Sequence, residues 1–222
     1  MNDATTVSYD LYLFDLDGTI SDPILGIGRS FNYALTHFGY EPLSNDQIGP
    51  CIGPPLDTSF ARITGTESQA EVLELVAKYR ERYAEIGFAE NTLYPGVKEV
   101  LETLYERGTR MAVCTSKRRD FAERILERFE LAHLLNFVDG GDVGIEKWQQ
   151  IAAMREDGRL TGSALMIGDR AVDLEAARRN DIVGGAVLWG YGSVEELQSE
   201  SPGHWFRSPK DWLAVRCEDF QV

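Results

Sequence analysis

The sequence predicts an α/β protein whose core is a Rossmann-like, doubly wound parallel sheet with an all-helical cap subdomain inserted into it. Apolar runs of strand length recur along the chain, and stretches with apolar residues at three-and-four spacing separate them. The segment after the first strand is helical and far longer than an ordinary connection. The expected strands are LYLF at 11–14, MAVCTS at 111–116, FVDGG at 137–141, ALMIGD at 164–169 and GAVLWG at 185–190.

Helices are expected between these strands. In the insertion, apolar periodicity predicts helices over 24–39, 56–65 and 67–87, and in the core over 95–108, 120–129 and 171–180. The stretch SPGHWFRSPKDW near the end predicts a surface turn, a last strand and a helix. This order assigns residues 1–20 and 93–222 to the α/β core and residues 21–92 to the cap. A cap placed directly after the first strand is expected to cover the carboxyl edge of the sheet, where ligands of open α/β folds bind.

Composition excludes several classes of partner. The 222 residues include 22 lysines and arginines against 36 aspartates and glutamates, which gives a net charge of −14. Such a field repels nucleic-acid backbones and anionic membranes, so neither is an expected partner. The absence of a membrane-spanning or signal-like segment predicts a cytoplasmic protein. Three scattered cysteines, Cys51, Cys114 and Cys217, favour neither a disulfide framework nor a zinc site.

Two pairs of acids follow apolar strands. Asp15 and Asp17 end the first strand, and side chains two apart on an extended chain point to the same side. Asp169 ends another apolar strand, and Asp173 follows four residues later. If these strand ends are adjacent, four carboxylates meet, and such a site requires a cation or a shared proton. Oxygen-only, carboxylate-rich surroundings favour Mg²⁺, whereas each aspartate alone would fit a helix cap or a turn.

Three motifs resemble those of the haloacid dehalogenase superfamily. FDLDGTISDP resembles its first motif, VCTSK its second and IGDRAVD its fourth, in the right order and separation. The helical insertion after the first motif resembles the small cap of the superfamily. IGPPL, ENTLYPGV and WGYGSVEEL are similar to the phosphoglycolate phosphatase-like group, and the IGPPL loop to its bacterial 5′-nucleotidase-like branch.

The resemblance implies a role for each acid. Asp15 would attack phosphorus, form an aspartyl-phosphate and bind Mg²⁺. Asp17 would protonate the leaving oxygen, then activate water, and its backbone carbonyl would help to hold Mg²⁺. Asp169 would be a direct metal ligand, and Asp173 would orient it from behind. The intact acid set argues against a dehalogenase, which has no use for Asp17.

Polar and basic residues complete the predicted site. The resemblance implies that Thr115 and Ser116 bind phosphoryl oxygens and that Lys147 balances the charge of nucleophile and phosphate. The family usually has proline after this lysine, and Trp148 stands there instead. A surface position for Lys147, with Lys117 supplying the charge, therefore stays open.

The resulting hypothesis is a Mg²⁺-dependent phosphomonoesterase, monomeric or homodimeric, acting on a small phosphorylated metabolite. Nucleoside 5′-monophosphates and phosphoglycolate are candidate substrates, and Gly53 and Arg80 of the cap are candidate substrate contacts. A phosphomutase of the same superfamily and a non-catalytic binding module on this fold are the alternatives. A cysteine phosphatase based on Cys114 is excluded by spacing, because Asp120 stands where that mechanism needs arginine.

Overall fold

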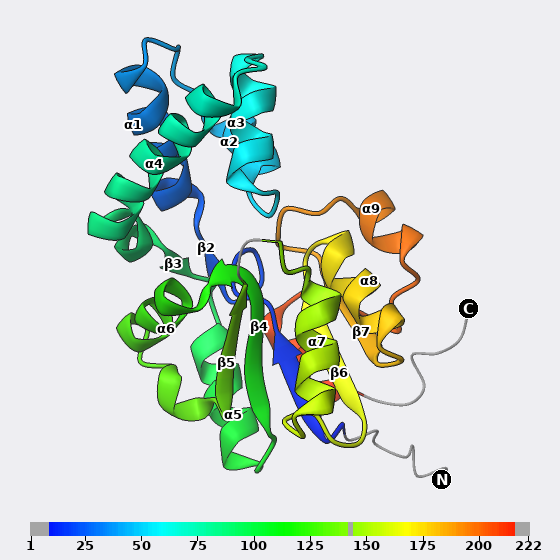
Figure 1. Cartoon of the computed structure of the whole chain (residues 1–222). Coiled ribbons are helices and arrows are strands. Elements are labelled where there is room, and N and C mark those ends of the chain that lie inside the picture. Colours follow the sequence, from blue (N-terminus) through cyan, green and yellow to red (C-terminus); the bar gives the residue numbers. More distant parts are fainter. Residues whose placement is uncertain (1–8, 142–143, 216–222) are drawn as a thin grey trace, which may run out of the picture. The chain divides into compact units, whose positions relative to one another are not determined.

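The structure is a computed structural model and describes residues 9–141 and 144–215; Cys217 lies outside this range. The chain forms two compact units, one made of residues up to Ser21 and from Leu93 onward, the other of Asp22–Thr92 (Figure 1). The short strands β2 (Ser21–Asp22) and β3 (Thr92–Leu93), through which the chain passes between the units, pair with each other.

A six-stranded parallel sheet forms the first unit. Its order is β5-β4-β1-β6-β7-β8, so β1 lies in the middle although it comes first in the chain. β1 pairs with β4 through Leu13↔Ala112 and with β6 through Leu13↔Met166. The strands are β1 (Leu11–Phe14), β4 (Met111–Arg118), β5 (Phe137–Gly141), β6 (Ala164–Gly168), β7 (Val183–Val187) and β8 (His204–Phe206). The predicted fold class is confirmed by this arrangement and by the solved structures described below.

Helices cover both faces of this sheet because its strands are apolar on both sides. Leu11 and Leu13 of β1 belong to a buried cluster with residues of α7 and α8, whereas Phe14 packs on Trp212, with ring centroids 4.9 Å apart. The α-helices of this unit are α5 (Val97–Glu106), α6 (Arg119–Arg128), α7 (Lys147–Glu156), α8 (Ala171–Arg179) and α9 (Val194–Ser199). Its 3-10 helices are η3 (Ala132–Leu134) and η4 (Pro209–Ala214).

The second unit is helical. Aromatic rings fill its core: Phe31 lies 4.8 Å from Phe60 and 5.0 Å from Tyr79, between ring centroids. Its helices are α1 (Ile24–His37), α2 (Asn45–Ile48), η1 (Gly49–Cys51), α3 (Leu56–Thr64), α4 (Gln69–Glu85) and η2 (Gly87–Glu90). Along the described part of the chain, no helix has both the length and the apolar character needed to cross a bilayer.

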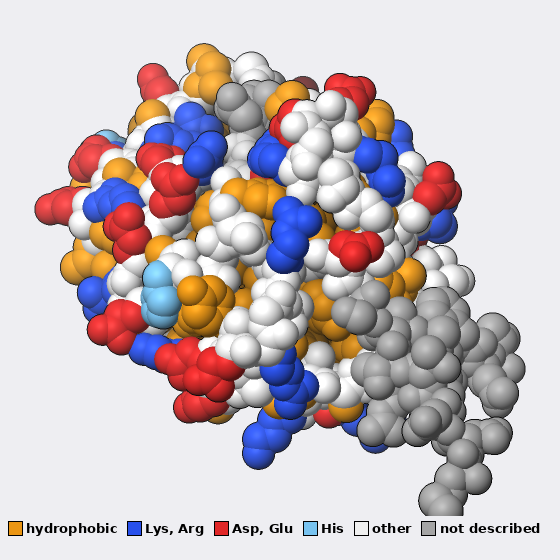
Figure 2. Space-filling model, turned by 90° about the horizontal axis from the view of Figure 1, so that it is seen from below, with side chains coloured by type: hydrophobic (Ala, Val, Ile, Leu, Met, Phe, Trp, Pro, Cys, Tyr) orange, Lys and Arg blue, Asp and Glu red, His pale blue; other side chains and the backbone are white. Residues whose placement is uncertain are grey.

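The charge of the protein is not spread as a uniform acidic field. On the face shown in Figure 2, lysine and arginine side chains are interspersed with aspartate and glutamate, and hydrophobic side chains lie between them. Local potential at a site therefore depends on the groups that surround it rather than on the net charge.

Candidate active site

The first two acids lie where β1 ends. The backbone N–H of Asp15 donates to the carbonyl of Ile167 at 2.8 Å, so the ladder between β1 and β6 continues to this residue. Asp15 is 7% exposed. Gly18, with φ +85°, then turns the chain away, and a side chain there would collide with Asp169, since its Cβ would lie 2.2 Å from Oδ2.

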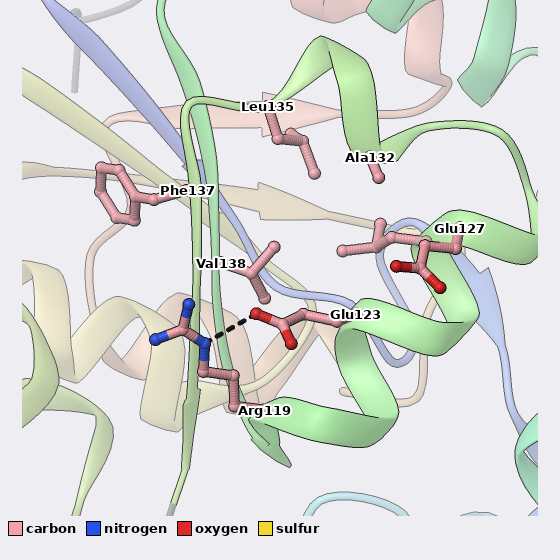
Figure 3. Close-up of a pocket in the computed structure, with 8 residues that line it drawn as sticks. Arg119, Glu123, Glu127, Ala132, Leu135, Phe137 and Val138 are labelled. Carbon is pink, nitrogen blue, oxygen red and sulfur yellow. Dashed lines mark hydrogen bonds and ion pairs between the residues drawn. The ribbon is translucent and has the colours of Figure 1, made fainter.

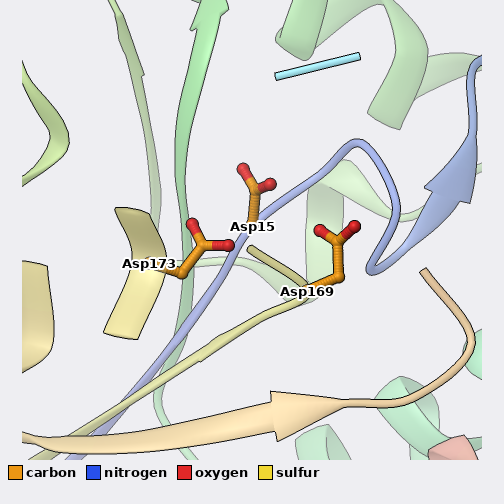
Figure 4. A group of neighbouring side chains, drawn as sticks. All are labelled: Asp15, Asp169 and Asp173. Atoms are coloured by element: carbon orange, nitrogen blue, oxygen red, sulfur yellow. The ribbon is translucent and has the colours of Figure 1, made fainter. Parts of the chain in front are cut away.

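The second pair of acids follows β6. Asp169 is fully buried directly after the strand, and Asp173 is fully buried in the first turn of α8. One ligand atom each from Asp15, Asp169 and Asp173 lies within 4.8 Å of the others. Figure 4 shows these three carboxylates gathered beside the end of β1. The parallel sheet thus brings together acids that are about 150 residues apart in sequence.

Two lysines balance different carboxylates. Lys147 opens α7 and is 5% exposed; its Nζ lies 2.9 Å from Asp15 Oδ1 and donates to Asp173 Oδ1. Lys117 Nζ lies 2.8 Å from Asp17 Oδ2. Lys147 is therefore not a surface lysine. The structure brings both lysines to the acids, where the sequence had left a choice between them.

The hydroxyl candidates lie in the second half of β4. This strand pairs with β1 through Phe14↔Val113, so Thr115 lies on the strand next to Asp15, two residues beyond that pair. Thr115 is 1% exposed; its carbonyl accepts from Gln150 Nε2 at 3.2 Å and its Oγ1 from the N–H of Lys117 at 3.2 Å. Ser116, the next residue of β4, is exposed.

Burial makes Asp17, Asp169 and Asp173 reluctant to ionise. Burial raises the pKa of Asp169 well above its usual value, and Asp173 and Asp15 add to the rise. Burial also raises the pKa of Asp173 to about 6, against the opposing charge of Lys147. The pKa of Asp17 rises for the same reason, although Lys117 opposes the shift.

The ammonium group of Lys147 stays charged. Burial by itself lowers the pKa of Lys147, but Asp15 and Asp173 outweigh this effect and hold the pKa above its usual value. Among the described residues, Lys147 is the cation that contacts this cluster of three carboxylates, so the remaining charge must be met by bound protons or by a further cation. In addition, Asp17 Oδ1 is buried without a hydrogen-bond partner among the described residues. This excess of buried oxygen ligands fits a divalent cation.

A separate hollow of about 270 Å³ lies between α6 and β5 (Figure 3). Arg119 and Glu123 line it and form an ion pair at 2.7 Å, and Phe137 and Val138 form its strand side. None of the aspartates described above lines this hollow. Its carboxylates, Glu123 and Glu127, are half-buried and exposed, unlike the buried acids at the carboxyl edge of β1 and β6.

Sequence reasoning missed several supporting residues. The helix α7 was not predicted, although Trp148, Ile151 and Met154 follow Lys147 at three-residue spacing. Gln150, which holds the Thr115 carbonyl, was also not recognised. The predicted cap residues Gly53 and Arg80 belong to the second unit, where both are exposed and Gly53 has φ +103°.

The chain belongs to the family of haloacid dehalogenase-like hydrolases, whose sequence profile matches residues 12–187. The predictions of this family and of a phosphatase of its type are confirmed by the comparisons with known proteins. A 5′-nucleotidase of Pseudomonas aeruginosa is 35% identical over 92% of this chain and 94% of its own length. A phosphoglycolate phosphatase of Aliivibrio fischeri is 30% identical over 86% of this chain and 89% of its own length.

Other similar proteins include a kinase and a further hydrolase. The tyrosine-protein kinase PtkA of Mycobacterium tuberculosis is 32% identical over 87% of this chain and 67% of its own length. Among solved structures, a haloacid dehalogenase-like hydrolase from Streptococcus pneumoniae superposes with a TM-score of 0.86 at 28% identity. It covers 93% of this chain and 97% of its own. The printed names therefore include a nucleotidase, a phosphatase, a kinase and a hydrolase.

Proposed function

We propose that the protein is a Mg²⁺-dependent phosphomonoesterase that hydrolyses small phosphate esters through an aspartyl-phosphate on Asp15. The observation that carries the proposal is the buried cluster of Asp15, Asp169 and Asp173, balanced by Lys147, with the second acid Asp17 two residues from the nucleophile. Phosphoryl transfer depends mainly on positioning and on cations around the equatorial oxygens, and this site is built from such groups.

Mg²⁺ would be held by the carboxylates of Asp15 and Asp169 and by the backbone carbonyl of Asp17. When bound, the ion supplies positive charge that offsets the negative charge of the phosphoryl group. Asp173, whose two oxygens already accept from Lys147 and from the N–H of Arg170, orients the site from behind.

The reaction proceeds in two displacements. In the first, a carboxylate oxygen of Asp15 attacks phosphorus, the bond from phosphorus to the ester oxygen breaks, and Asp17 gives its proton to that oxygen. In the second, Asp17 takes a proton from water, the water oxygen attacks phosphorus, and the bond from phosphorus to Asp15 breaks. The raised pKa of Asp17 supports the first role, since it favours the protonated acid before the ester is cleaved.

The remaining groups position the phosphoryl oxygens. The hydroxyls of Thr115 and Ser116 would donate to them, and Lys147 would neutralise the nucleophile and the transferred group. Lys117 Nζ lies 2.8 Å from Asp17 Oδ2. This ion pair would keep the carboxyl group of Asp17 near the leaving group.

Substrate identity is proposed from the relatives. Nucleoside 5′-monophosphates and phosphoglycolate are the first candidates, because the relatives named above are a 5′-nucleotidase and a phosphoglycolate phosphatase. The 21–92 cap would select among them, with Gly53 and Arg80 as candidate contacts. A cytoplasmic location and a monomeric or homodimeric state stay predictions.

Transfer to an acceptor other than water is the second candidate. One relative is named a tyrosine-protein kinase, and a phosphomutase would use the same acids. The two candidates share the phosphoenzyme and differ only in the second displacement.

The test is phosphate release from a panel of nucleotides, phosphoglycolate and sugar phosphates, with Mg²⁺ or with EDTA. Wild type is compared with Asp15→Asn and with the control Asp120→Asn, whose carboxylate is half exposed in a surface ion pair. We expect turnover that needs both Mg²⁺ and Asp15 and is unchanged in the control. Turnover that survives in EDTA or in Asp15→Asn contradicts the proposal. Loss of the ester without release of phosphate would favour transfer to a second acceptor.

A further inference from the structure

Residues 188–196, the segment that follows β7, surround the buried carboxylate of Asp169. The backbone N–H of Tyr191 donates to Asp169 Oδ2 at 2.7 Å. The indole N–H of Trp189 donates to the carbonyl of Thr19 at 3.1 Å, and Thr19 Oγ1 is 3.4 Å from Asp169 Oδ1. The segment therefore contacts this acid directly and also through the turn that follows β1.

Two glycines let the segment approach this closely. A Cβ on Gly190 would lie 2.2 Å from the Cβ of Asp169, and a Cβ on Gly192 would lie 2.0 Å from its carbonyl oxygen. Neither glycine has a positive φ, so backbone conformation does not require them. They are needed because any side chain would occupy the space of Asp169 and push the two segments apart.

Glu196, near the end of the segment, forms hydrogen bonds with the two residues that follow Asp169. Glu196, in the first turns of α9, accepts from Arg170 Nε at 2.8 Å and from the N–H of Ala171 at 2.9 Å with the same oxygen. The N–H of Arg170 in turn donates to Asp173 Oδ2 at 3.0 Å. Thus the turn between β6 and α8 is held on one side by the Tyr191 N–H and on the other by the Glu196 carboxylate.

We propose that residues 188–196 form a positioning clamp that sets the divalent-metal affinity of the site without touching the metal. The inference rests on the proposed function, in which Asp169 is a metal ligand. A carboxylate ligand binds a metal well only when its oxygens are held in the required direction, and hydrogen-bond partners behind metal ligands typically contribute 10-fold to 100-fold in affinity. The clamp supplies such partners to Asp169 and to the turn that leads to Asp173.

The test compares two clamp variants with two matched controls. Gly190→Ala places a methyl group against Asp169. In the control Gly184→Ala, in β7, the three atoms nearest to the new methyl group belong to Leu174 and Ala177 and lie 3.0 Å or more away. Glu196→Ala removes the shared acceptor, whereas Glu195→Ala removes an exposed carboxylate from the same helix. Glu196→Gln retains one oxygen that can accept both bonds and serves as the rescue variant.

The measured quantity is the dissociation constant of Mn²⁺, obtained from the paramagnetic resonance signal of the free ion and checked by competition with Mg²⁺. Far-UV circular dichroism and the melting temperature in EDTA establish that each variant is folded. We expect the clamp variants to bind Mn²⁺ about 10-fold to 100-fold more weakly, the controls to match wild type, and Glu196→Gln to recover most of the loss.

The outcomes separate this inference from the proposed function. Wild type that binds no divalent metal at this site contradicts the proposed function and the clamp with it. Wild type that binds, with folded clamp variants that bind within about threefold of it, overturns the clamp alone. A lower melting temperature in EDTA with unchanged Mn²⁺ affinity assigns the segment a structural role only and likewise overturns the inference.

Discussion

Replacing Lys147 by methionine is expected to destabilise the metal-free core strongly. The Lys147 side chain is 3% exposed, and its partners Asp15 and Asp173 are 10% and 0% exposed in their side chains. Removing one partner of a buried ion pair costs about 3–5 kcal/mol, because a buried charge stays behind without compensation. We expect about 3 kcal/mol, since the carboxylates can take up a proton instead of remaining charged.

The assay is scanning calorimetry in EDTA at neutral pH. For a chain of this size, about 3 kcal/mol lowers the melting temperature by about 6–12 °C. The control Lys98→Met removes a lysine whose side chain is 33% exposed and whose partner Glu130 is 77% exposed, so we expect a change of no more than about 1 kcal/mol. A Lys147→Met protein that melts within about 2 °C of wild type would refute the view of Lys147 as the counter-ion of the cluster.

The effect also depends on pH, with a defined sign. Wild-type Lys147 has a raised pKa, so its contribution is fully present at neutral pH and is lost only as the pH rises through that value. Lys147 lowers the pKa of Asp173, which is about 6 in the wild type, so the variant has a higher pKa at this carboxyl and acidification to about pH 5 protonates it. We therefore expect the difference from wild type to shrink on acidification.

Three further substitutions test the site. Asp169→Asn should raise the melting temperature in EDTA and abolish stabilisation by Mg²⁺. Burial, Asp173 and Asp15 raise the pKa of Asp169, so above about pH 4 the folded wild type binds more protons than the unfolded chain and loses stability as the pH rises towards the folded pKa. The advantage of the variant should therefore grow as the pH rises above about 4, and a variant that loses this advantage at higher pH would contradict the prediction. Cys114→Ala should keep kcat within about threefold of wild type, because burial raises the pKa of the Cys114 thiol and makes it a poor nucleophile. A loss of phosphate release of about 100-fold would instead support a cysteine mechanism. Thr115→Val should lower kcat/KM by about 100-fold and Thr115→Ser should retain most activity, measured with the best substrate of the panel; equal activity of the two variants would remove Thr115 from the phosphoryl contacts.

The sheet could be predicted from the sequence because its signal is local. Buried parallel strands are short apolar runs, and the run at 11–14 ends directly at Asp15. The same logic placed Asp169 at the end of the run at 164–169. Because parallel strands end at one edge of a sheet, strand prediction placed the acids at that edge, whereas the adjacency of β1 and β6 comes from the structure.

The position of Lys147 could not be predicted in this way. A lysine after a glycine-containing loop is usually exposed, and its burial depends on how α7 packs against β4 and α8, which is a long-range contact. The choice between Lys147 and Lys117 depended on the same packing. The alternation rule also stops applying after Phe14, where the strand ends, so the pairing of Asp17 with Lys117 had no local signal.

The contacts of residues 188–196 with Asp169 could not be predicted from the sequence either. WGYGSVEEL could be matched to a family, but Gly190 and Gly192 are explained only by a close approach to Asp169, which comes from a different strand. Some glycines are needed because a side chain would collide with another segment, not because the backbone has a positive φ. No local sequence pattern distinguishes such a glycine from a turn glycine.

The central claim is that Asp15 becomes phosphorylated, and the most direct measurement is acid quenching of the enzyme with its best substrate, followed by peptide mass spectrometry. We expect the peptide that contains Asp15 to carry one added phosphoryl group early in turnover, and we expect this mass increment to be absent in Asp15→Asn. Phosphate release without any phosphorylated peptide at any quench time, or a phosphoryl group on another residue, would contradict the account.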